Sequence, residues 1–273
     1  MRFAICNELF EGWTFRRMAE CVAATGYDGI ELAPYTLAGR VDEISPAARR
    51  ELAAIAGDLG LAITGLHWLL AQPPGLQLLA PDAATRSRTI DHLRSLVDLC
   101  ADLGGRVMVF GSPYQRSRPE GVSPAVAQAW AVDAFRQVGD AAAAREVTLC
   151  LEALPADLTN VLTTNAEVAA FVAALAHPHV GMMVDVKSMS SERMPVVDNL
   201  RTWAGRFAHV HANDANGRGP GFGTVDFRPI LATLQDQGYE GFVSVEVFDF
   251  TGGAELIAAR SLEYLRACRG ATP

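Results

Sequence analysis

The chain has 273 residues, of which 50% are hydrophobic and 20% are charged, and its formal net charge is −8. This composition excludes an intrinsically disordered chain, and the acidic balance opposes nucleic-acid binding through phosphate contacts. No uncharged apolar run reaches the roughly 18 residues that a transmembrane helix needs, so we expect no membrane partner.

The cysteines and the N-terminus indicate the cellular compartment. The five cysteines are odd in number and show no Cys-x-x-Cys spacing, which is typical of reduced thiols. The N-terminus enters an apolar strand pattern without the basic segment of a signal peptide. We therefore expect a cytoplasmic protein.

Strand and helix patterns alternate along the whole chain. We predict strands at 3–7, 28–33, 62–67, 106–111, 147–152, 180–185, 207–212 and 242–247. We predict helices near 14–25, 46–59, 82–103, 123–144, 165–176, 195–204, 226–237 and 253–268. Such alternation is typical of a parallel sheet.

Capping residues support these boundaries. Helix starts carry N-cap signals at Thr14, Ser45, Asp82, Ser123, Thr164 and Asp226. Several helices end in glycine before the next strand, at Gly26, Gly60, Gly104 and Gly238. Eight regular units without a long linker favour a single (β/α)8 TIM barrel of the α/β class over a doubly wound open sheet. We expect it to be one domain, 1–273, close to the usual barrel length of about 250 residues.

Four residues close consecutive predicted strands: Glu152, Asp185, His211 and Glu246. The C-terminal ends of the strands meet at the mouth of such a barrel, where these enzymes carry their active sites. Three carboxylates and one imidazole would repel one another or be costly to bury without a cation. The pattern predicts one divalent metal ion, Mn²⁺ first, with Mg²⁺, Co²⁺ or Zn²⁺ as alternatives.

Each of these residues also has a plain structural interpretation. A single acidic residue at a strand end is usually solvated or caps a helix. His211 could cap the barrel core through a hydrogen bond, and we expect His209, one layer lower, to be a core histidine. Four successive strands that end in the same way favour the metal site.

The chain resembles the xylose isomerase-like barrels, often described as sugar phosphate isomerases/epimerases, and in its motifs the ketose 3-epimerases such as D-tagatose 3-epimerase. The segments that carry the resemblance are LEALPADLTNVLTTNAEV, GMMVDVKSM, HVHANDANGRGPGFGTVDF and GFVSVEVF. The resemblance implies that Glu152, Asp185, His211 and Glu246 are the metal ligands. It also implies that Glu152 and Glu246 are the catalytic acid/base pair.

The match fails at three positions that contact substrate in the ketose 3-epimerases. Leu158 stands where they carry a glutamate, Ser188 stands in place of a histidine, and Arg218 is a shifted counterpart of their arginine. Lys187 could replace a lost donor or be a solvated lysine. The metal and acid/base chemistry therefore transfers better than the identity of the substrate.

Other polar and aromatic residues follow the predicted strands. Glu8, Glu31 and His67 close the first three strands, and we expect them to form a polar wall opposite the metal that binds sugar hydroxyls. Trp68 and Tyr114 could stack on a sugar face or pack within their loops.

Two arginines of the fourth strand's loop, Arg116 and Arg118, could hold a phosphate or be solvated. Cys6 lacks a base beside it in the sequence, so we do not expect it to be a nucleophile.

These residues predict a metal-dependent sugar isomerase or epimerase that moves a proton through an enediolate. The alternative with the same first step is a dehydratase or lyase of a keto-inositol or a 3-keto-glycoside. A non-catalytic sugar-binding protein and an endonuclease IV-like phosphodiesterase fit less well, since the four-ligand set is intact and the chain has only six histidines. We expect a small carbohydrate as the partner; the sequence leaves open whether the protein is a homo-oligomer.

Overall fold

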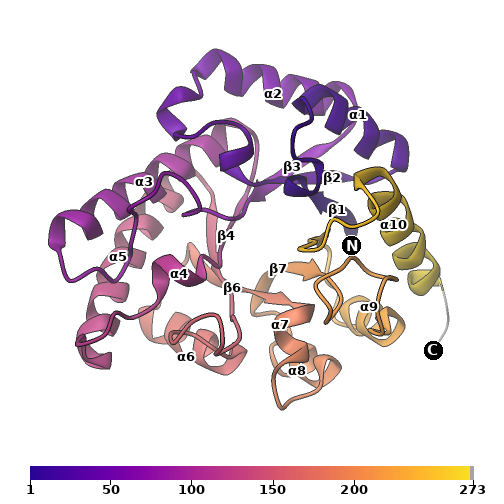
Figure 1. The fold of residues 1–273 in the computed structure, drawn as a ribbon. Helices are drawn as coiled ribbons and strands as arrows, with labels where there is room; N and C mark the ends of the chain where they lie inside the picture. Colours follow the sequence, from indigo (N-terminus) through magenta and orange to yellow (C-terminus); the bar gives the residue numbers. More distant parts are fainter. Residues whose placement is uncertain (271–273) are drawn as a thin grey trace.

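The computed structural model describes residues 1–270 and is a closed barrel of eight parallel strands in the order β1 to β8 (Figure 1). The strands are β1 Arg2–Cys6, β2 Gly29–Leu32, β3 Ala62–Leu66, β4 Val107–Phe110, β5 Thr148–Leu151, β6 Val180–Asp185, β7 Phe207–Ala212 and β8 Phe242–Val245. The predicted (β/α)8 barrel is confirmed.

Within residues 1–270, eight helices of seven residues or more surround the barrel. They are α1 Phe15–Thr25, α2 Pro46–Asp58, α3 Ala83–Asp102, α5 Pro124–Ala144, α6 Asn165–Leu175, α8 Val196–Thr202, α9 Phe227–Asp236 and α10 Ala254–Gly270. The last helix, α10 (yellow), packs beside α1 (indigo), next to the pairing of β1 with β8 that closes the barrel (Figure 1). None of the helices within residues 1–270 combines the length and the apolar character needed to cross a bilayer.

The predicted helix starts are confirmed by their hydrogen bonds. The side chains of Thr14, Ser45, Asp82, Ser123, Thr164 and Asp226 each accept a backbone N–H from the first turn that follows. At the other end of α1, Gly26 has a φ of 100°, a left-handed conformation that glycine adopts without strain. Local sequence signals therefore set the length of each strand–helix unit.

The loops contain short elements that the sequence analysis did not predict. They are the helices α4 Pro113–Arg116 and α7 Val186–Ser190 and the 3-10 turns η1 Asn7–Phe10, η2 Pro34–Thr36 and η3 Val41–Glu43. In Figure 1, α4 and α7 lie on either side of β6. Several residues that follow strands are therefore held by a turn of helix rather than by an open loop.

A register shift between β6 and β7 matters for the site. Met182 pairs with Phe207, but further along the same two strands Asp185 pairs with His211, one residue out of step. Such an irregularity changes the direction of the side chains beyond it. It brings Asp185 and His211 level at the mouth of the barrel.

Candidate metal centre and adjoining cavity

The four residues predicted to bind a metal lie together. One side-chain oxygen or nitrogen from each of Glu152, Asp185, His211 and Glu246 lies within 4.8 Å of the corresponding atom of every other, and all four side chains are buried. Glu152 and Glu246 directly follow β5 and β8, whereas Asp185 and His211 belong to β6 and β7. Alternation along the strands points these side chains into the barrel.

The layer below the four residues is apolar on the side of β4, β5 and β6, and polar on the side of β7 and β8, where His209 and Ser244 are buried. Val109, Cys150 and Met183 form a small buried cluster inside the barrel. Cys150 precedes Glu152 by two residues and Met183 precedes Asp185 by two, so each pair shares one face of its strand. Burial away from solvent strengthens the electrostatic interactions among the four side chains above this layer.

The carboxylates oppose one another in the absence of a cation. Burial, together with the nearby Asp185 and Glu246, raises the pKa of Glu152 to about 8. Burial also raises the pKa of Glu246, and His211 only partly offsets this. A divalent ion would remove this conflict, because its charge favours the ionised form of each carboxyl group.

The orientation of His211 leaves one ring nitrogen free for a metal. Its Nε2 lies 3.0 Å from Oε1 of Glu31, and the other oxygen of Glu31 lies 2.7 Å from Nε2 of His209. Nδ1 of His211 is buried, has no hydrogen-bond partner and lies 3.1 Å from Oε2 of Glu246. A carboxylate on the far nitrogen is the usual way in which proteins orient a metal-binding histidine. The donor set therefore fits a divalent ion held through Nδ1.

Protonation in this cluster depends on Glu31. Burial opposes its charge, but His209 and His211 lower the pKa of Glu31 well below its usual range. Burial likewise opposes a charge on His211, but Glu31 and Glu246 raise its pKa well above the usual range. Metal binding needs the neutral ring, so a bound ion would replace the proton on Nδ1.

Glu31 does not face the sugar-binding space that we expected it to line. It is 1% exposed and is held beneath the mouth by His209 and His211. The register between β2 and β3 shifts between Ile30 and Glu31, which redirects the side chain. Glu31 therefore contacts His209 and His211 and is not part of the cavity wall.

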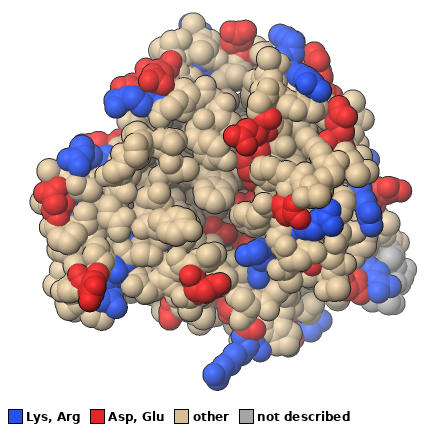
Figure 2. Space-filling view, in the orientation of Figure 1, with Lys and Arg blue, Asp and Glu red and all other residues tan. Residues whose placement is uncertain are grey.

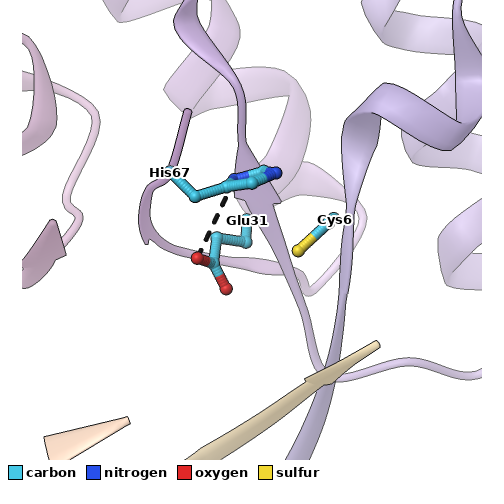
Figure 3. A group of neighbouring side chains, drawn as sticks. All are labelled: Cys6, Glu31 and His67. Atoms are coloured by element: carbon cyan, nitrogen blue, oxygen red, sulfur yellow. Dashed lines mark ion pairs between the residues drawn. The ribbon is translucent and has the colours of Figure 1, made fainter. Parts of the chain in front are cut away.

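Of the three residues expected to form the polar wall, only His67 lines the cavity. Its Nε2 lies 2.6 Å from Oε2 of Glu8, and its Nδ1 lies 3.8 Å from Oε1 of Glu31, the ion pair dashed in Figure 3. Burial lowers the tendency of His67 to charge, but Glu8 and Glu31 raise its pKa to about 9. Glu8 and Glu31 therefore influence the cavity indirectly, because they raise the pKa of His67, which lines it.

Figure 3 also places Cys6 beside Glu31 and His67. Burial, together with Glu31 and Glu8, raises the pKa of the Cys6 thiol well above its usual value. The reactive form of a cysteine is the thiolate. The structure agrees with the expectation that Cys6 is not a nucleophile.

The sequence analysis missed Asn213, which directly follows β7. Its amide nitrogen donates to Oδ2 of Asp185 at 2.5 Å and to Oε2 of Glu246 at 3.4 Å. Its Oδ1 accepts the backbone N–H of Lys187 at 2.8 Å. The other oxygen of Asp185 caps α7 by accepting the N–H of Ser188 at 2.6 Å. Two of the four side chains are therefore held by hydrogen bonds before any ligand arrives.

A cavity of about 250 Å³ opens over Glu152, Asp185 and Glu246, with His211 buried behind them. Its walls are His67, Trp68, Val109, Gly111, Ser112, Pro113, Tyr114, Glu152, Leu154, Leu158, Asp185, Lys187, Ser188, Glu246 and Phe248. Figure 2 shows a hollow near the centre of the visible face, surrounded mainly by uncharged residues, with acidic atoms in and beside it. Trp68, Tyr114, Lys187, Ser188 and Leu158 all line this cavity, and their contact with a substrate stays a prediction.

Gly111 sits against one of the four residues. A Cβ added at Gly111 would collide with Oε2 of Glu152. The absence of a side chain at this position is what lets the carboxylate lie against β4.

The three arginines considered in the sequence analysis, Arg116, Arg118 and Arg218, do not line the cavity. Arg218 donates to the carbonyl oxygen of Thr251 and lies 3.6 Å from Asp249, so it ties the loops after β7 and β8 together. Arg116 is 1% exposed and donates to the carbonyl oxygens of Glu152 and Leu162, at 2.7 and 3.1 Å. Arg118 donates to the carbonyl oxygen of Val122. Each of the three binds backbone oxygen atoms rather than facing the cavity.

Comparisons with known proteins agree with this geometry. Residues 19–268 match the model of the family described as xylose isomerase-like TIM barrel. The chain is 31% identical over 241 residues to D-psicose 3-epimerase of Agrobacterium fabrum (strain C58 / ATCC 33970), covering 86% of this chain and 79% of that protein. It is 23% identical over 252 residues to fructoselysine 3-epimerase of Shigella flexneri, covering 89% of this chain and 88% of that protein.

Solved structures are also similar. A crystal structure of D-psicose 3-epimerase in the presence of D-fructose superposes with a TM-score of 0.85 at 26% identity, covering 99% of this chain and all of that one. A 3-keto-D-glucoside 4-epimerase from E. coli superposes with a TM-score of 0.84 at 20% identity, which shows a common fold alone. It covers 98% of this chain and 100% of that one.

Proposed function

Because the chain belongs to the xylose isomerase-like TIM barrel family, we propose that it is a metal-dependent isomerase or epimerase of a sugar or sugar derivative. The reaction removes the proton on the carbon next to a carbonyl group and returns it after an enediolate has formed. The partner is a small carbohydrate. The relatives that support this proposal are ketose 3-epimerases by name, as the motifs of the sequence had suggested.

The observation that carries the proposal is the placement of two buried glutamates. Glu152 and Glu246 come from β5 and β8, which are separated in the barrel by β6 and β7. Both line the cavity, and burial raises the pKa of each. Carboxyl groups whose pKa is raised towards neutrality suit general acid/base catalysis.

The two glutamates divide the proton transfers. One carboxylate takes the proton from one face of the substrate, and the other carboxyl group returns a proton to the opposite face, which inverts that carbon. Return to the neighbouring carbon gives isomerisation instead. A bound divalent cation would supply stabilisation of the negative charge that develops on the carbonyl oxygen.

Asp185 and His211 complete the proposed ligand set with the two glutamates. Three carboxylates and one imidazole nitrogen suit a hard divalent ion, and Mn²⁺ is our first choice over Mg²⁺, Co²⁺ and Zn²⁺. Asn213 and Glu31 hold Asp185 and His211 in their orientations. Lys187 and Ser188, on α7, are placed to contact the substrate.

A second candidate, a dehydratase or lyase, is favoured by His67. This histidine lines the cavity, and its pKa is raised to about 9, chiefly by Glu8 against the effect of burial. A protonated His67 could donate to a leaving group next to the enediolate, which would convert proton transfer into β-elimination. Loss of water or of an alcohol from the substrate distinguishes this reaction from epimerisation.

The cellular compartment belongs to the same proposal. All five cysteines are free, and Cys6, Cys100 and Cys150 are fully enclosed. Reduced cysteines favour the cytoplasm.

Proton exchange tests the function directly. The Mn²⁺-loaded protein is incubated in D₂O with a panel of ketoses, keto-inositols and keto-glycosides, and deuterium uptake is followed by NMR. We expect uptake at the carbon next to the carbonyl of at least one compound, and its loss in Glu152→Gln and Glu246→Gln. The matched control is Glu255→Gln, at an exposed position on α10. Absence of uptake with every carbonyl compound would contradict the proposal.

A further inference from the structure

The outer half of the cavity is lined mainly by apolar side chains. Above the four acidic and imidazole groups, its walls are Trp68 after β3, Pro113 after β4, Leu154 and Leu158 after β5, and Phe248 after β8. These side chains come from four different loops. They therefore surround the end of a substrate that points away from Glu152 and Glu246.

The polar groups near that end are few: the side chains of Ser112, Lys187 and Ser188, the rim hydroxyl of Tyr114, and the buried, unpartnered Nε1 of Trp68. The Ser112 hydroxyl accepts the backbone N–H of Leu70. The Lys187 ammonium lies 5.3 Å above the ring of Phe248. Each sugar hydroxyl buried there without a partner would weaken binding by roughly 5- to 150-fold. The outer half is therefore a poor site for a fully hydroxylated sugar chain.

Trp68 and Phe248 form one aromatic corner of this half, in which Phe248 is 45% exposed. Trp68 and Phe248 meet edge to face, with ring centres 6.4 Å apart. Trp68 has a φ of 52° and Ser112 a φ of 46°, conformations that non-glycine residues keep only where their surroundings enforce them. The backbone N–H of Phe248 donates to Gly217 in the loop after β7. An aromatic wall on a constrained backbone favours stacking by a flat ring over contact with a flexible chain.

We infer that the substrate carries a flat aromatic group at the end away from Glu152 and Glu246, as in a keto-glycoside with an aryl aglycone. The inference rests on the proposed function, because it assigns the sugar to the acidic centre and the aryl group to the outer half. Tyr114, 75% exposed at the rim, extends the apolar surface outwards.

Equilibrium binding tests the inference without catalysis. The Mn²⁺-loaded protein is titrated calorimetrically with phenyl and methyl β-D-glucopyranoside, with the same pair of galactosides, and with hexyl β-D-glucopyranoside. We expect one phenyl glycoside to bind at least about ten-fold more tightly than its methyl partner. Equal affinity within both pairs, or no binding of either phenyl glycoside, would overturn the inference. A hexyl glucoside that binds as tightly as the best phenyl glycoside would overturn the assignment of an aromatic ring.

Matched variants locate the effect. Leu158→Asn should reduce the preference for phenyl over methyl several-fold, because it puts an amide where the ring would lie. Leu256→Asn makes the same change at an exposed position on α10 and should keep the preference. An equal preference in both variants would move the aryl group out of this cavity.

Proton exchange in D₂O separates the two ideas. Exchange with ketoses but no phenyl preference would overturn the inference and leave the proposed function standing. A phenyl preference without exchange on any carbonyl compound would remove the function and keep the aromatic subsite.

Discussion

The inner and outer halves of the cavity are built by different parts of the chain. The inner half consists of titratable side chains at strand ends, and three of them are held in place: Asn213 donates to Asp185 and Glu246, and Glu31 accepts from His211. The outer half consists of apolar side chains from the loops that follow β3, β4, β5 and β8. The difference separates two tasks: the barrel strands position the groups that move protons, and the loops select what is attached to the reacting sugar.

The largest expected effect belongs to the inner half. Glu246→Gln removes an acid/base group but keeps an oxygen towards the metal, so we expect the rate of proton exchange to fall by roughly 10²–10⁴-fold. Exchange into the best carbonyl compound of the D₂O panel measures this, with bound manganese determined on the same sample. Exchange at the wild-type rate with manganese retained would remove Glu246 from the proton transfer.

A smaller effect, on metal affinity, is expected from substitution of Glu31, which lies below the four proposed ligands. Glu31→Gln weakens the acceptor for Nε2 of His211, and losses of this kind reduce metal affinity by about 10–100-fold. Manganese titration followed by electron paramagnetic resonance measures the dissociation constant, and Glu255→Gln on α10 is the matched control. If both variants bind manganese like the wild type, Glu31 does not position His211.

The stability of the metal-free protein should fall as the pH rises. The pKa of Glu152 is raised from 4.5 to about 8, so its folded-state advantage is complete below pH 4.5 and is lost as the pH passes 8. The raised pKa of His67, from 6.5 to about 9, acts in the same direction at higher pH. We expect the melting temperature in EDTA to decrease between pH 5 and pH 8, and less so in Glu152→Gln. A melting temperature that rises over this interval would contradict the electrostatic account.

The smallest effect is expected at the rim of the outer half. Tyr114 is 75% exposed, so Tyr114→Ala removes little buried surface. We expect KM for the carbonyl substrate to change by less than about ten-fold and kcat to change less than KM. A large fall in kcat would place Tyr114 in the reaction and would break the division between the two halves.

The sequence predicted the barrel and the inner site because both follow local rules. Caps such as Thr14 and Asp82 define where helices start, and strands alternate with them in a regular way. Glu152 and Glu246 could be found because a polar residue at the end of an apolar strand is a local signal.

The outer half and the supporting residues were harder to predict. Leu154 and Phe248 lie two residues after Glu152 and Glu246, on the same side of an extended chain, so alternation could have indicated them. Glu31 was misplaced because its direction depends on a register shift between β2 and β3. Arg116 was misplaced because the turn of helix that buries it was not predicted.

Anomalous diffraction at the manganese edge from crystals soaked in Mn²⁺ tests the central claim most directly. The account predicts one strong peak per chain, with carboxylate oxygens of Glu152, Asp185 and Glu246 about 2.0–2.3 Å away and Nδ1 of His211 as the nitrogen ligand. His211→Ala should weaken that peak. A peak elsewhere, or four side chains that remain more than about 6 Å apart around no ion, would contradict the account, because ligand bonds to these metals are no longer than about 2.6 Å.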